Sequence, residues 1–329
     1  MTSQLPLAVT MGDPAGCGPQ ITDAAWLNLR ASARPFFVIS QPDLYSVPTT
    51  VIQKPSEAAH IFQDALPILP ISQALPQIDP GTPDVKTAPA IIKSIEQAVR
   101  LSLSNDAAGV VTNPISKALL YSAGFKHPGH TEFLADLCKA ASENPPKPIM
   151  MLVGGGLRVA LATIHVPLAN IPDLITQDLL IETARIVHHD LITKFGLAAP
   201  RIAFTGLNPH AGEAGTIGRE EVEIINPAAE TLRAKGIQIS DARPGDTVFH
   251  EALQGEYDAV IAMTHDQGLI PVKTLDMWGG VNTTLGLPIM RTSPDHGTAH
   301  DAAARGTVRA DSLIAAIELA SDLAESANR

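Results

Sequence analysis

The stretch Tyr257–Lys273, YDAVIAMTHDQGLIPVK, contains the pattern that decides the fold. Its apolar run Ala259–Met263 is typical of a buried β-strand, and the polar cluster Thr264–Gly268 marks the point where that strand leaves a sheet. In open α/β sheets, ligands bind just outside the carboxyl ends of the strands. The sequence therefore directs attention to His265, an imidazole beside a carboxylate at such a strand end.

Two further histidines occupy the same position relative to an apolar run. His165 follows LRVALATI, and His210 follows RIAFTGLNP. Three imidazoles from separate strand ends match the ligand number of a catalytic zinc site and leave one position for a substrate. Imidazole alone does not choose among zinc, cobalt, nickel and manganese. The alternative is that His165, His210 and His265 are three unrelated polar histidines.

The composition excludes several classes of protein. Hydrophobic residues make up 45% and charged residues 17% of the 329 residues, as in soluble globular proteins of one or two domains. Lys and Arg number 23 against 34 Asp and Glu, and the net charge of −11 disfavours nucleic acid and anionic membranes as partners. The two cysteines, Cys17 and Cys138, argue against a disulfide scaffold. Because no apolar run could span a bilayer and the N-terminus lacks a signal pattern, we expect a cytoplasmic protein.

Strand and helix patterns alternate along the chain, which predicts a parallel α/β architecture. Strands are expected at Leu5–Thr10, Phe36–Ser40, Ala107–Val111, Ile149–Val153, Leu157–Ile164, Pro200–Thr205, Ile237–Ser240 and Ala259–Met263. Helices are expected up to Arg30, near Ser56–Ala65, at Ile91–Leu103, from Thr131 onward, at Thr176–Lys194 and Gly218–Lys235, and from Asp311 to the C-terminus.

A glycine-rich turn, MGDPAGCGPQ, follows the first expected strand. Glycines at a strand-to-helix turn let the backbone approach a ligand closely. The spacing of Gly12, Gly16 and Gly18 is not the GxGxxG fingerprint of dinucleotide-binding turns. A tight turn without a ligand and a ligand-binding turn therefore both fit this pattern.

Five further residues are candidates for binding an anionic substrate. His130 and Thr131 begin a helix, where the free N–H groups favour a phosphate or a carboxylate, although Thr131 could simply cap the helix. Lys273, Asn282 and Arg291 follow the third histidine, and an arginine can bind a phosphate or carboxylate in a bidentate manner. Ordinary surface exposure is the alternative for each.

These features fit three classes of protein. A metallohydrolase would use a metal-bound water, with Asp266 or Asp246 as the base. A metal-dependent dehydrogenase would use the ion to polarise an alcohol during loss of hydride. The third class is a metal-binding or sensing protein without catalytic activity.

Several motifs, taken in their order along the chain, resemble those of a known protein family. MGDPAGCGP, TNPISK, GHTEF, GLNPHAGE, HDQGLIPVK and RTSPDHGTAHD together resemble the 4-hydroxythreonine-4-phosphate dehydrogenase family of pyridoxal phosphate biosynthesis, from about Val9 to the final helix. The resemblance implies a fold like that of isocitrate and isopropylmalate dehydrogenases, with two α/β/α domains and a cleft between them. We expect the first domain at residues 1–125 with 288–329, and the second at residues 126–287.

The resemblance also implies roles for the candidate residues. It implies that a zinc, magnesium or cobalt ion is shared across a homodimer interface, and that an HGSA-type loop holds NAD or NADP without a Rossmann fingerprint. The implied metal ligands are His165, His210 and His265, and the implied substrate contacts are His130, Thr131, Lys273, Asn282 and Arg291. The expected cofactor contacts are Gly12, Asp13, His296, Gly297, Thr298 and Ala299, and the candidates for proton transfer are Lys273, Asp246 and Asp266.

The implied reaction is the oxidation of 4-phosphooxy-L-threonine to 2-amino-3-oxo-4-phosphooxybutanoate, which loses CO2 to give 3-amino-2-oxopropyl phosphate. Oxidation of D-threonate or D-erythronate 4-phosphate is the main alternative within the superfamily. Relatives that oxidise aromatic cis-dihydrodiols act on substrates without a phosphate, which the retained basic residues disfavour. The chain departs from the family pattern at Cys17, Gln20 and Ala304, all near the expected cofactor loops.

Overall fold

The computed structural model describes residues 4–31, 34–127, 129–141 and 145–327, which form two compact α/β units. Unit 1 contains the described residues of Met1–Pro148 together with Leu287–Glu325, and unit 2 contains those of Ile149–Gly286 and Ser326–Arg329. The predicted α/β class is confirmed. The segment from 126 to 148, expected in the second domain, belongs to unit 1 because its helix α5 (His130–Cys138) packs against α3 (Ala88–Leu103).

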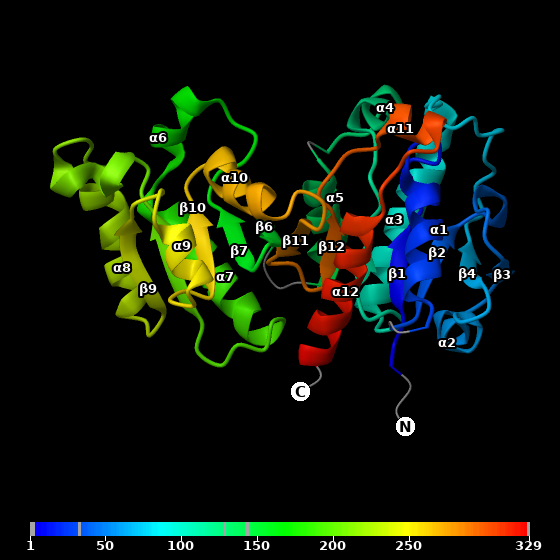
Figure 1. Ribbon diagram of the computed structural model, residues 1–329, viewed down its shortest axis with the longest axis horizontal. Coiled ribbons are helices and arrows are strands. Elements are labelled where there is room, and N and C mark those ends of the chain that lie inside the picture. Colours follow the sequence, from blue (N-terminus) through cyan, green and yellow to red (C-terminus); the bar gives the residue numbers. More distant parts are fainter. Residues whose placement is uncertain (1–3, 32–33, 128, 142–144, 328–329) are drawn as a thin grey trace. The chain divides into compact units, whose positions relative to one another are not determined.

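The sheet of unit 1 is parallel in all of its described pairings, in the order β3-β4-β2-β1-β5-β12. Its strands are β1 (Leu7–Thr10), β2 (Phe36–Ser40), β3 (Thr49–Val51), β4 (Leu66–Pro70), β5 (Val110–Val111) and β12 (Arg291–Pro294). Its other helices are α1 (Gly18–Leu29), α2 (Ala58–Ile61), α4 (Lys117–Ser122), α11 (His300–Arg305) and α12 (Asp311–Ser326), shown in Figure 1.

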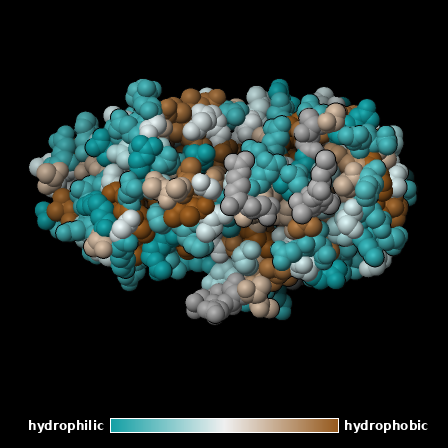
Figure 2. Space-filling model, turned by 90° about the horizontal axis from the view of Figure 1, so that it is seen from below, coloured by the Kyte–Doolittle hydropathy of each residue, from teal (hydrophilic) through white to brown (hydrophobic). Residues whose placement is uncertain are grey.

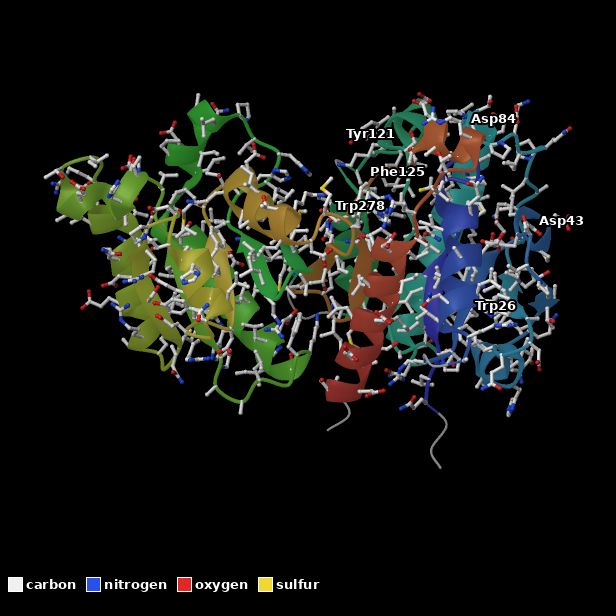
Figure 3. All side chains as sticks on the ribbon, in the orientation of Figure 1. Trp26, Asp43, Asp84, Tyr121, Phe125 and Trp278 are labelled. Carbon is white, nitrogen blue, oxygen red and sulfur yellow. The ribbon has the colours of Figure 1, made fainter. Side chains whose placement is uncertain are left out.

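The central strands of unit 1 are apolar on both faces because helices cover both. Every residue of β1 and of β2 is buried, as expected for parallel strands between two helical layers. The apolar residues of α3 recur at helical spacing and pack on β1 and β2 (Figure 1). Trp26 of α1 is fully buried, and its Nε1 donates a hydrogen bond to the carbonyl of Phe62 at 2.8 Å (Figure 3).

The sheet of unit 2 has the order β11-β6-β7-β10-β8-β9, with β6 antiparallel to both of its neighbours and the other pairs parallel. The strands are β6 (Ile149–Gly154), β7 (Leu157–Leu161), β8 (Arg201–Thr205), β9 (Gln238–Arg243), β10 (Ala259–Ala262) and β11 (Val281–Leu285). The helices are α6 (Ile171–Leu174), α7 (Gln177–Thr193), α8 (Asn226–Arg233), α9 (Val248–Leu253) and α10 (His265–Leu275).

Unit 2 buries a separate core on each face of its sheet, because side chains alternate along a strand. Ile202, Phe204 and Ile261 point into the core that includes α7 and α8, whereas Ala203 and Val260 point into the core that includes α9 and α10. The unit is therefore a three-layer α/β/α structure. No helix among the described residues is long and apolar enough to cross a membrane.

Four elements differ from the sequence-based prediction. The polar cluster after Met263 is the first turn of helix α10, because the Thr264 hydroxyl caps it by accepting from the N–H of Gln267 at 3.3 Å. The helix expected at Gly218–Lys235 begins with a π-helical segment, Glu221–Ile225, before α8. Strands β11 and β12 were not predicted, since their threonine-rich and serine-containing sequences lack a long apolar run.

A buried hydroxyl links the helical layer of unit 1 to the ends of its central strands. The Ser94 hydroxyl accepts from the N–H of Met11 at 2.9 Å and donates to the carbonyl of Ile39 at 2.7 Å. We expect Ser94→Ala to lower the free energy of unfolding by about 1–3 kcal/mol, because it leaves buried backbone groups unsatisfied. Urea denaturation measures this, with the exposed Ser72→Ala as control. Equal stability of the two variants would contradict the prediction.

Candidate functional site

All three predicted metal ligands follow neighbouring strands of unit 2. Strand β10 lies between β7 and β8 and is parallel to both, so the carboxyl ends of the three strands meet at one edge of the sheet. His165 follows β7, His210 follows β8 in the segment Pro209–Gly215, and His265 begins α10 after β10. The sheet therefore brings the three segments to the same edge, as the strand-end pattern predicts.

Two of these histidines are neighbours within one chain. The ring centroids of His165 and His265 are 5.3 Å apart, with 43° between the ring planes. Nδ1 of His265 lies 2.8 Å from Oδ1 of Asp266. A carboxylate on one ring nitrogen orients the imidazole and leaves the other nitrogen for a metal, as is usual for metal-binding histidines. This geometry favours an orienting role for Asp266, which was predicted as a candidate for proton transfer.

The third histidine, His210, is exposed and lies apart from the other two. The His210 side chain is 67% exposed, and its Nδ1 lies 3.6 Å from Oε1 of Glu213. Among the described residues, no three His, Cys, Asp or Glu side chains lie close enough together to hold a metal ion. The paired imidazoles of His165 and His265 could serve as two ligands of a divalent ion. Within one chain, His210 does not lie close enough to act as the third ligand.

A glutamine that the sequence analysis did not single out ties the strand ends together. Oε1 of Gln267 accepts from the Thr205 hydroxyl at 2.7 Å and from the N–H of Met263 at 2.9 Å, and its Nε2 donates to the carbonyl of Gly206 at 2.8 Å. These bonds join the end of β8 to the end of β10. The spacing of Thr264 and Gln267 is typical of a helix capping box, and this pattern in the sequence could have identified Gln267.

A buried basic cluster lies in unit 1. Arg291 begins β12, is only 4% exposed, and donates from Nε and Nη2 to the Thr112 hydroxyl at 3.1 and 2.6 Å. Burial lowers the pKa of Arg291 to about 10. His130 begins α5, and its Nε2 is buried without a hydrogen-bond partner among the described residues. Burial, followed by the charges of Arg291 and Lys117, lowers the pKa of His130 well below 6.5. Such a cluster suits an anion.

The remaining predicted substrate and proton-transfer residues occupy the following places. Thr131 is half-buried in the first turn of α5, beside His130. Lys273 is half-buried in the last turn of α10. Asn282 is half-buried on β11. Asp246 is exposed in the loop between β9 and α9. Of the predicted substrate residues, His130 and Arg291 lie in the same unit, and the charge of Arg291 acts on His130.

The glycine-rich turn packs tightly against two other loops of unit 1. Gly12 has a φ of +71°, and a Cβ there would lie 2.7 Å from Cβ of Asn113. A Cβ on Gly16 would lie 2.8 Å from the carbonyl oxygen of Thr298, which also accepts from the N–H of Cys17 at 2.8 Å. The glycines are therefore required by close packing within the protein. The same packing brings the two groups of predicted cofactor residues together.

A contact between two polar side chains strengthens this packing. Nε2 of His300 lies 3.0 Å from Oδ2 of Asp13, which is completely buried, and Nδ1 of His300 lies 3.3 Å from the Thr298 hydroxyl. The other Asp13 carboxylate oxygen accepts from the N–H of Ala15 at 3.1 Å. The sequence analysis predicted Asp13 but not His300, because a contact across nearly the whole chain leaves no local pattern.

Two of the three departures from the family pattern contact the short segment 297–304, and the third, Ala304, lies in it. Sγ of Cys17 lies 3.7 Å from the carbonyl oxygen of Gly297, and burial raises the pKa of its thiol to about 11. Nε2 of Gln20 donates to the carbonyl of Ala303 at 3.0 Å, a bond that an ionised acid could not donate. The methyl group of Ala304 lies against Gly81, where a Cβ would approach it to 2.6 Å.

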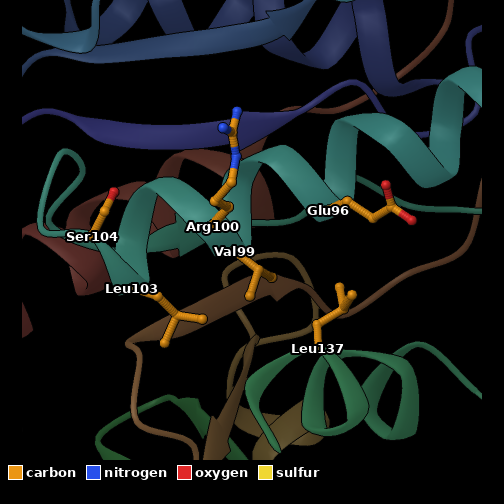
Figure 4. A pocket seen from close by; sticks show the side chains of 6 residues that line it. All are labelled: Glu96, Val99, Arg100, Leu103, Ser104 and Leu137. Carbon is orange, nitrogen blue, oxygen red and sulfur yellow. The ribbon is translucent and has the colours of Figure 1, made fainter. Parts of the chain in front are cut away.

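One surface pocket lies apart from these residues. It has a volume of about 440 Å³ and is formed by α3, its C-cap residue Ser104 and one residue of α5 (Figure 4). No predicted site residue lines it, so we do not assign it to the functional site. Its lining residues are Glu96, Val99, Arg100, Leu103, Ser104 and Leu137.

Comparisons with known proteins agree with the resemblance inferred from the motifs. The family model described as "Pyridoxal phosphate biosynthetic protein PdxA" matches residues 24–320. A 4-hydroxythreonine-4-phosphate dehydrogenase from Caulobacter vibrioides is 51% identical over 330 residues, covering 98% of each chain.

Solved structures give the same result. A 4-hydroxythreonine-4-phosphate dehydrogenase from Klebsiella pneumoniae is 35% identical, with a TM-score of 0.86 over 97% of this chain and 99% of that one. A terephthalate 1,2-cis-dihydrodiol dehydrogenase from Burkholderia xenovorans is 25% identical, with a TM-score of 0.67 over 97% of this chain and 98% of that one. The family match spans most of the sequence, and the chain therefore belongs to the PdxA family of pyridoxal phosphate biosynthetic proteins.

Proposed function

We propose that this protein is a 4-hydroxythreonine-4-phosphate dehydrogenase of pyridoxal phosphate biosynthesis, which oxidises 4-phosphooxy-L-threonine with NAD or NADP. The observation that carries the proposal is the identity of about half of all residues to enzymes of that name over nearly the whole chain. The strand-end histidines and the buried basic cluster supply the two kinds of binding group that this substrate needs. A cytoplasmic location remains a prediction.

Bound NAD or NADP would supply the oxidant, a nicotinamide that accepts the hydride lost from the C3 alcohol of the substrate. The resulting 2-amino-3-oxo-4-phosphooxybutanoate loses CO2 and gives 3-amino-2-oxopropyl phosphate. A divalent ion, when bound by the histidines, lowers the pKa of the substrate hydroxyl. Asp266 orients His265 through its contact with Nδ1. Lys273 and Asp246 remain the candidates for accepting the proton.

The metal site is proposed to lie between two protomers. His165 and His265 are paired within one chain, whereas His210 is exposed and does not join them. His210 of the partner subunit would supply the third ligand to zinc, cobalt or magnesium. Unit 2 also exposes large apolar side chains, as expected of a surface that another subunit covers. Those flanking the strand-end histidines are Val166 (39% exposed), Leu168 (77%), Ile217 (48%) and Ile270 (64%).

Apolar atoms also reach the surface at several places on the face in Figure 2, among mostly hydrophilic residues. In the turn that follows α10, Met277 is 57% exposed and Trp278, labelled in Figure 3, is 54% exposed. These side chains extend the exposed apolar surface of unit 2, which supports a homodimer.

The basic cluster of unit 1 is proposed to hold the substrate phosphate. Nε and Nη2 of Arg291 donate to the Thr112 hydroxyl, and Nε2 of His130, on which the charge of Arg291 acts, is buried in the same unit. A phosphate could accept hydrogen bonds from a guanidinium and from an imidazole. Thr131, Lys273 and Asn282 are proposed to bind the rest of the substrate. A phosphate remote from the bond changes supplies binding energy for orientation.

The nicotinamide cofactor is proposed to bind along the glycine-rich turn and the loop of residues 296–299. Gly297 is exposed, and no described atom lies within 4 Å of the place where its Cβ would be, which leaves room for a ligand. Thr298 and the Asp13–His300 pair hold this loop beside Gly12. The proposed contacts are Gly12, Asp13, His296, Gly297, Thr298 and Ala299.

The alternatives act on related substrates. A D-threonate or D-erythronate 4-phosphate would use the same phosphate cluster and the same metal. A cis-dihydrodiol, the substrate for which one solved relative is named, lacks a phosphate, and that relative is only 25% identical. A metallohydrolase is disfavoured by membership of a family whose curated relatives are dehydrogenases.

The substrate is tested by measuring NADH formation at about 340 nm, the absorbance of reduced nicotinamide. Metal-loaded protein is given 4-phosphooxy-L-threonine, D-threonate 4-phosphate or D-erythronate 4-phosphate. We expect kcat/KM to be highest for the amino acid. A preference for either sugar acid would replace the proposed substrate, and no NADH with any of them would contradict a dehydrogenase.

The shared metal site predicts complementation between two inactive variants. His165→Ala and His210→Ala should each be inactive alone, because each removes one ligand from every site. After mixing and reassembly, each heterodimer has one site with both substitutions and one intact site. Activity should therefore return to about a quarter of the wild-type value, since half of the dimers are mixed. No recovery, with mixed dimers demonstrated by differential tagging, would place all three ligands in one chain.

The lowered pKa of His130 predicts a pH-dependent loss of stability. Below its ordinary pKa of about 6.5 the unfolded chain takes up a proton that the folded protein excludes, so stability falls as the pH falls. The stability of the wild type relative to His130→Asn should decrease between pH 7.5 and 5.5, by at most about 1.4 kcal/mol per pH unit. Urea denaturation at several pH values measures this. A difference that does not depend on pH would contradict a buried neutral imidazole.

A further inference from the structure

The segment that carries His210 has an unusual backbone. The five successive residues His210–Ala214 are all left-handed, with φ between 42° and 74°. Only Gly212 among them lacks a Cβ, and the left-handed conformation costs other residues roughly 1–2 kcal/mol each. Such strain persists only where surrounding contacts enforce it, and it is common at functional sites. Other groups must therefore hold this turn in place.

A single buried carboxylate provides those contacts. Glu221 is only 1% exposed. Its Oε1 accepts from the N–H groups of Leu207 and Asn208, both at 2.8 Å, and its Oε2 accepts from Nδ2 of Asn208 at 3.0 Å. These residues lie immediately before the strained turn. The carboxylate therefore fixes the point at which the chain enters it.

The turn is also wrapped closely around this carboxylate. A Cβ on Gly212 would lie 2.5 Å from Oε2 of Glu221, and one on Gly206 would lie 3.2 Å from Oε1. Glu221 begins the π-helical segment Glu221–Ile225, and π-helical turns are frequent at functional sites. The position of this side chain is thus set by the packing of the turn and by an irregularity in the helix.

The neighbouring carboxylates do not duplicate this role. Glu220 accepts from Nδ2 of Asn208 at 2.7 Å but is half-buried and has no described contact with the backbone of the turn. Glu223 is 56% exposed and pairs with Arg219. Only Glu221 among these three combines burial with bonds to the backbone just before His210.

We propose that Glu221 is a positioning residue of the metal site, which presents the His210 imidazole to the divalent ion by fixing the turn from Leu207 to Ala214. The inference rests on the proposed function, in which His210 is a metal ligand. Glu221 acts through the backbone of the turn and is not itself a metal ligand. This role would explain the strained backbone, because the strained turn directs the His210 imidazole away from its own chain.

The test is a Co²⁺ titration of the metal-free, full-length protein, followed by visible absorbance. Glu221→Gln keeps the size of the side chain but places an NH₂ group against the Asn208 amide. We expect it to weaken Co²⁺ binding roughly 10- to 100-fold, the range seen when partners of metal ligands are removed. Saturating Co²⁺ should restore turnover. Glu223→Gln is the matched control, on the same helical segment, and should bind Co²⁺ as the wild type does.

A double-mutant cycle separates positioning from a structural role. In a His210→Ala background, Glu221→Gln should have no further effect on Co²⁺ affinity. An equal loss in both backgrounds, or a lower unfolding temperature with unchanged Co²⁺ affinity, would overturn the role of Glu221. Unchanged Co²⁺ binding by His210→Ala alone would instead overturn the proposed metal site.

A second variant covers the case in which Glu221→Gln does not fold. Asn208→Ser removes the amide that bonds to Glu221 but keeps both backbone N–H groups. We expect a smaller loss of Co²⁺ affinity that also disappears in the His210→Ala background. Wild-type affinity in Asn208→Ser together with an unfolded Glu221→Gln would refute the positioning role and leave Glu221 as a folding determinant.

Discussion

The parallel arrangement of β7, β10 and β8 is the constraint on which the candidate site depends. Because the strands are hydrogen-bonded neighbours, the chain leaves all three at one edge of the sheet. Gln267 ties two of these ends together through three hydrogen bonds. Histidines that are far apart in sequence are therefore presented along one edge. Their chemistry depends on the order of the strands more than on any local motif.

The sequence predicted this part of the structure well, because it depends on apolar runs and on the polar residues just after them. Strand β2 has the expected bounds, and the strands that precede His165, His210 and His265 are all present. The pattern could not show that the chain after Met263 is a helix, since its polar start could equally be a loop. Capping by Thr264 was the only local sign of that helix.

The residues that the sequence could not identify act through contacts between distant segments. Glu221 lies in a run that has the pattern of an ordinary amphipathic helix, and only the structure reveals its bonds to the turn before His210. His300 contacts Asp13 across nearly the length of the chain. The buried state of Arg291 likewise depends on β12 pairing with β5. Such contacts arise from the fold, and a single sequence contains no periodic signal for them.

The discontinuity of unit 1 has a consequence for how the protein is made. All strands of unit 2 lie within one continuous stretch, so this unit can fold as soon as that stretch has left the ribosome. Unit 1 cannot complete its sheet until β12 and α12 have been synthesised. Its glycine-rich turn, which is synthesised before unit 2, must wait for the segment around Thr298. Unit 2, which is inserted between the two parts of unit 1, can therefore fold before unit 1 does.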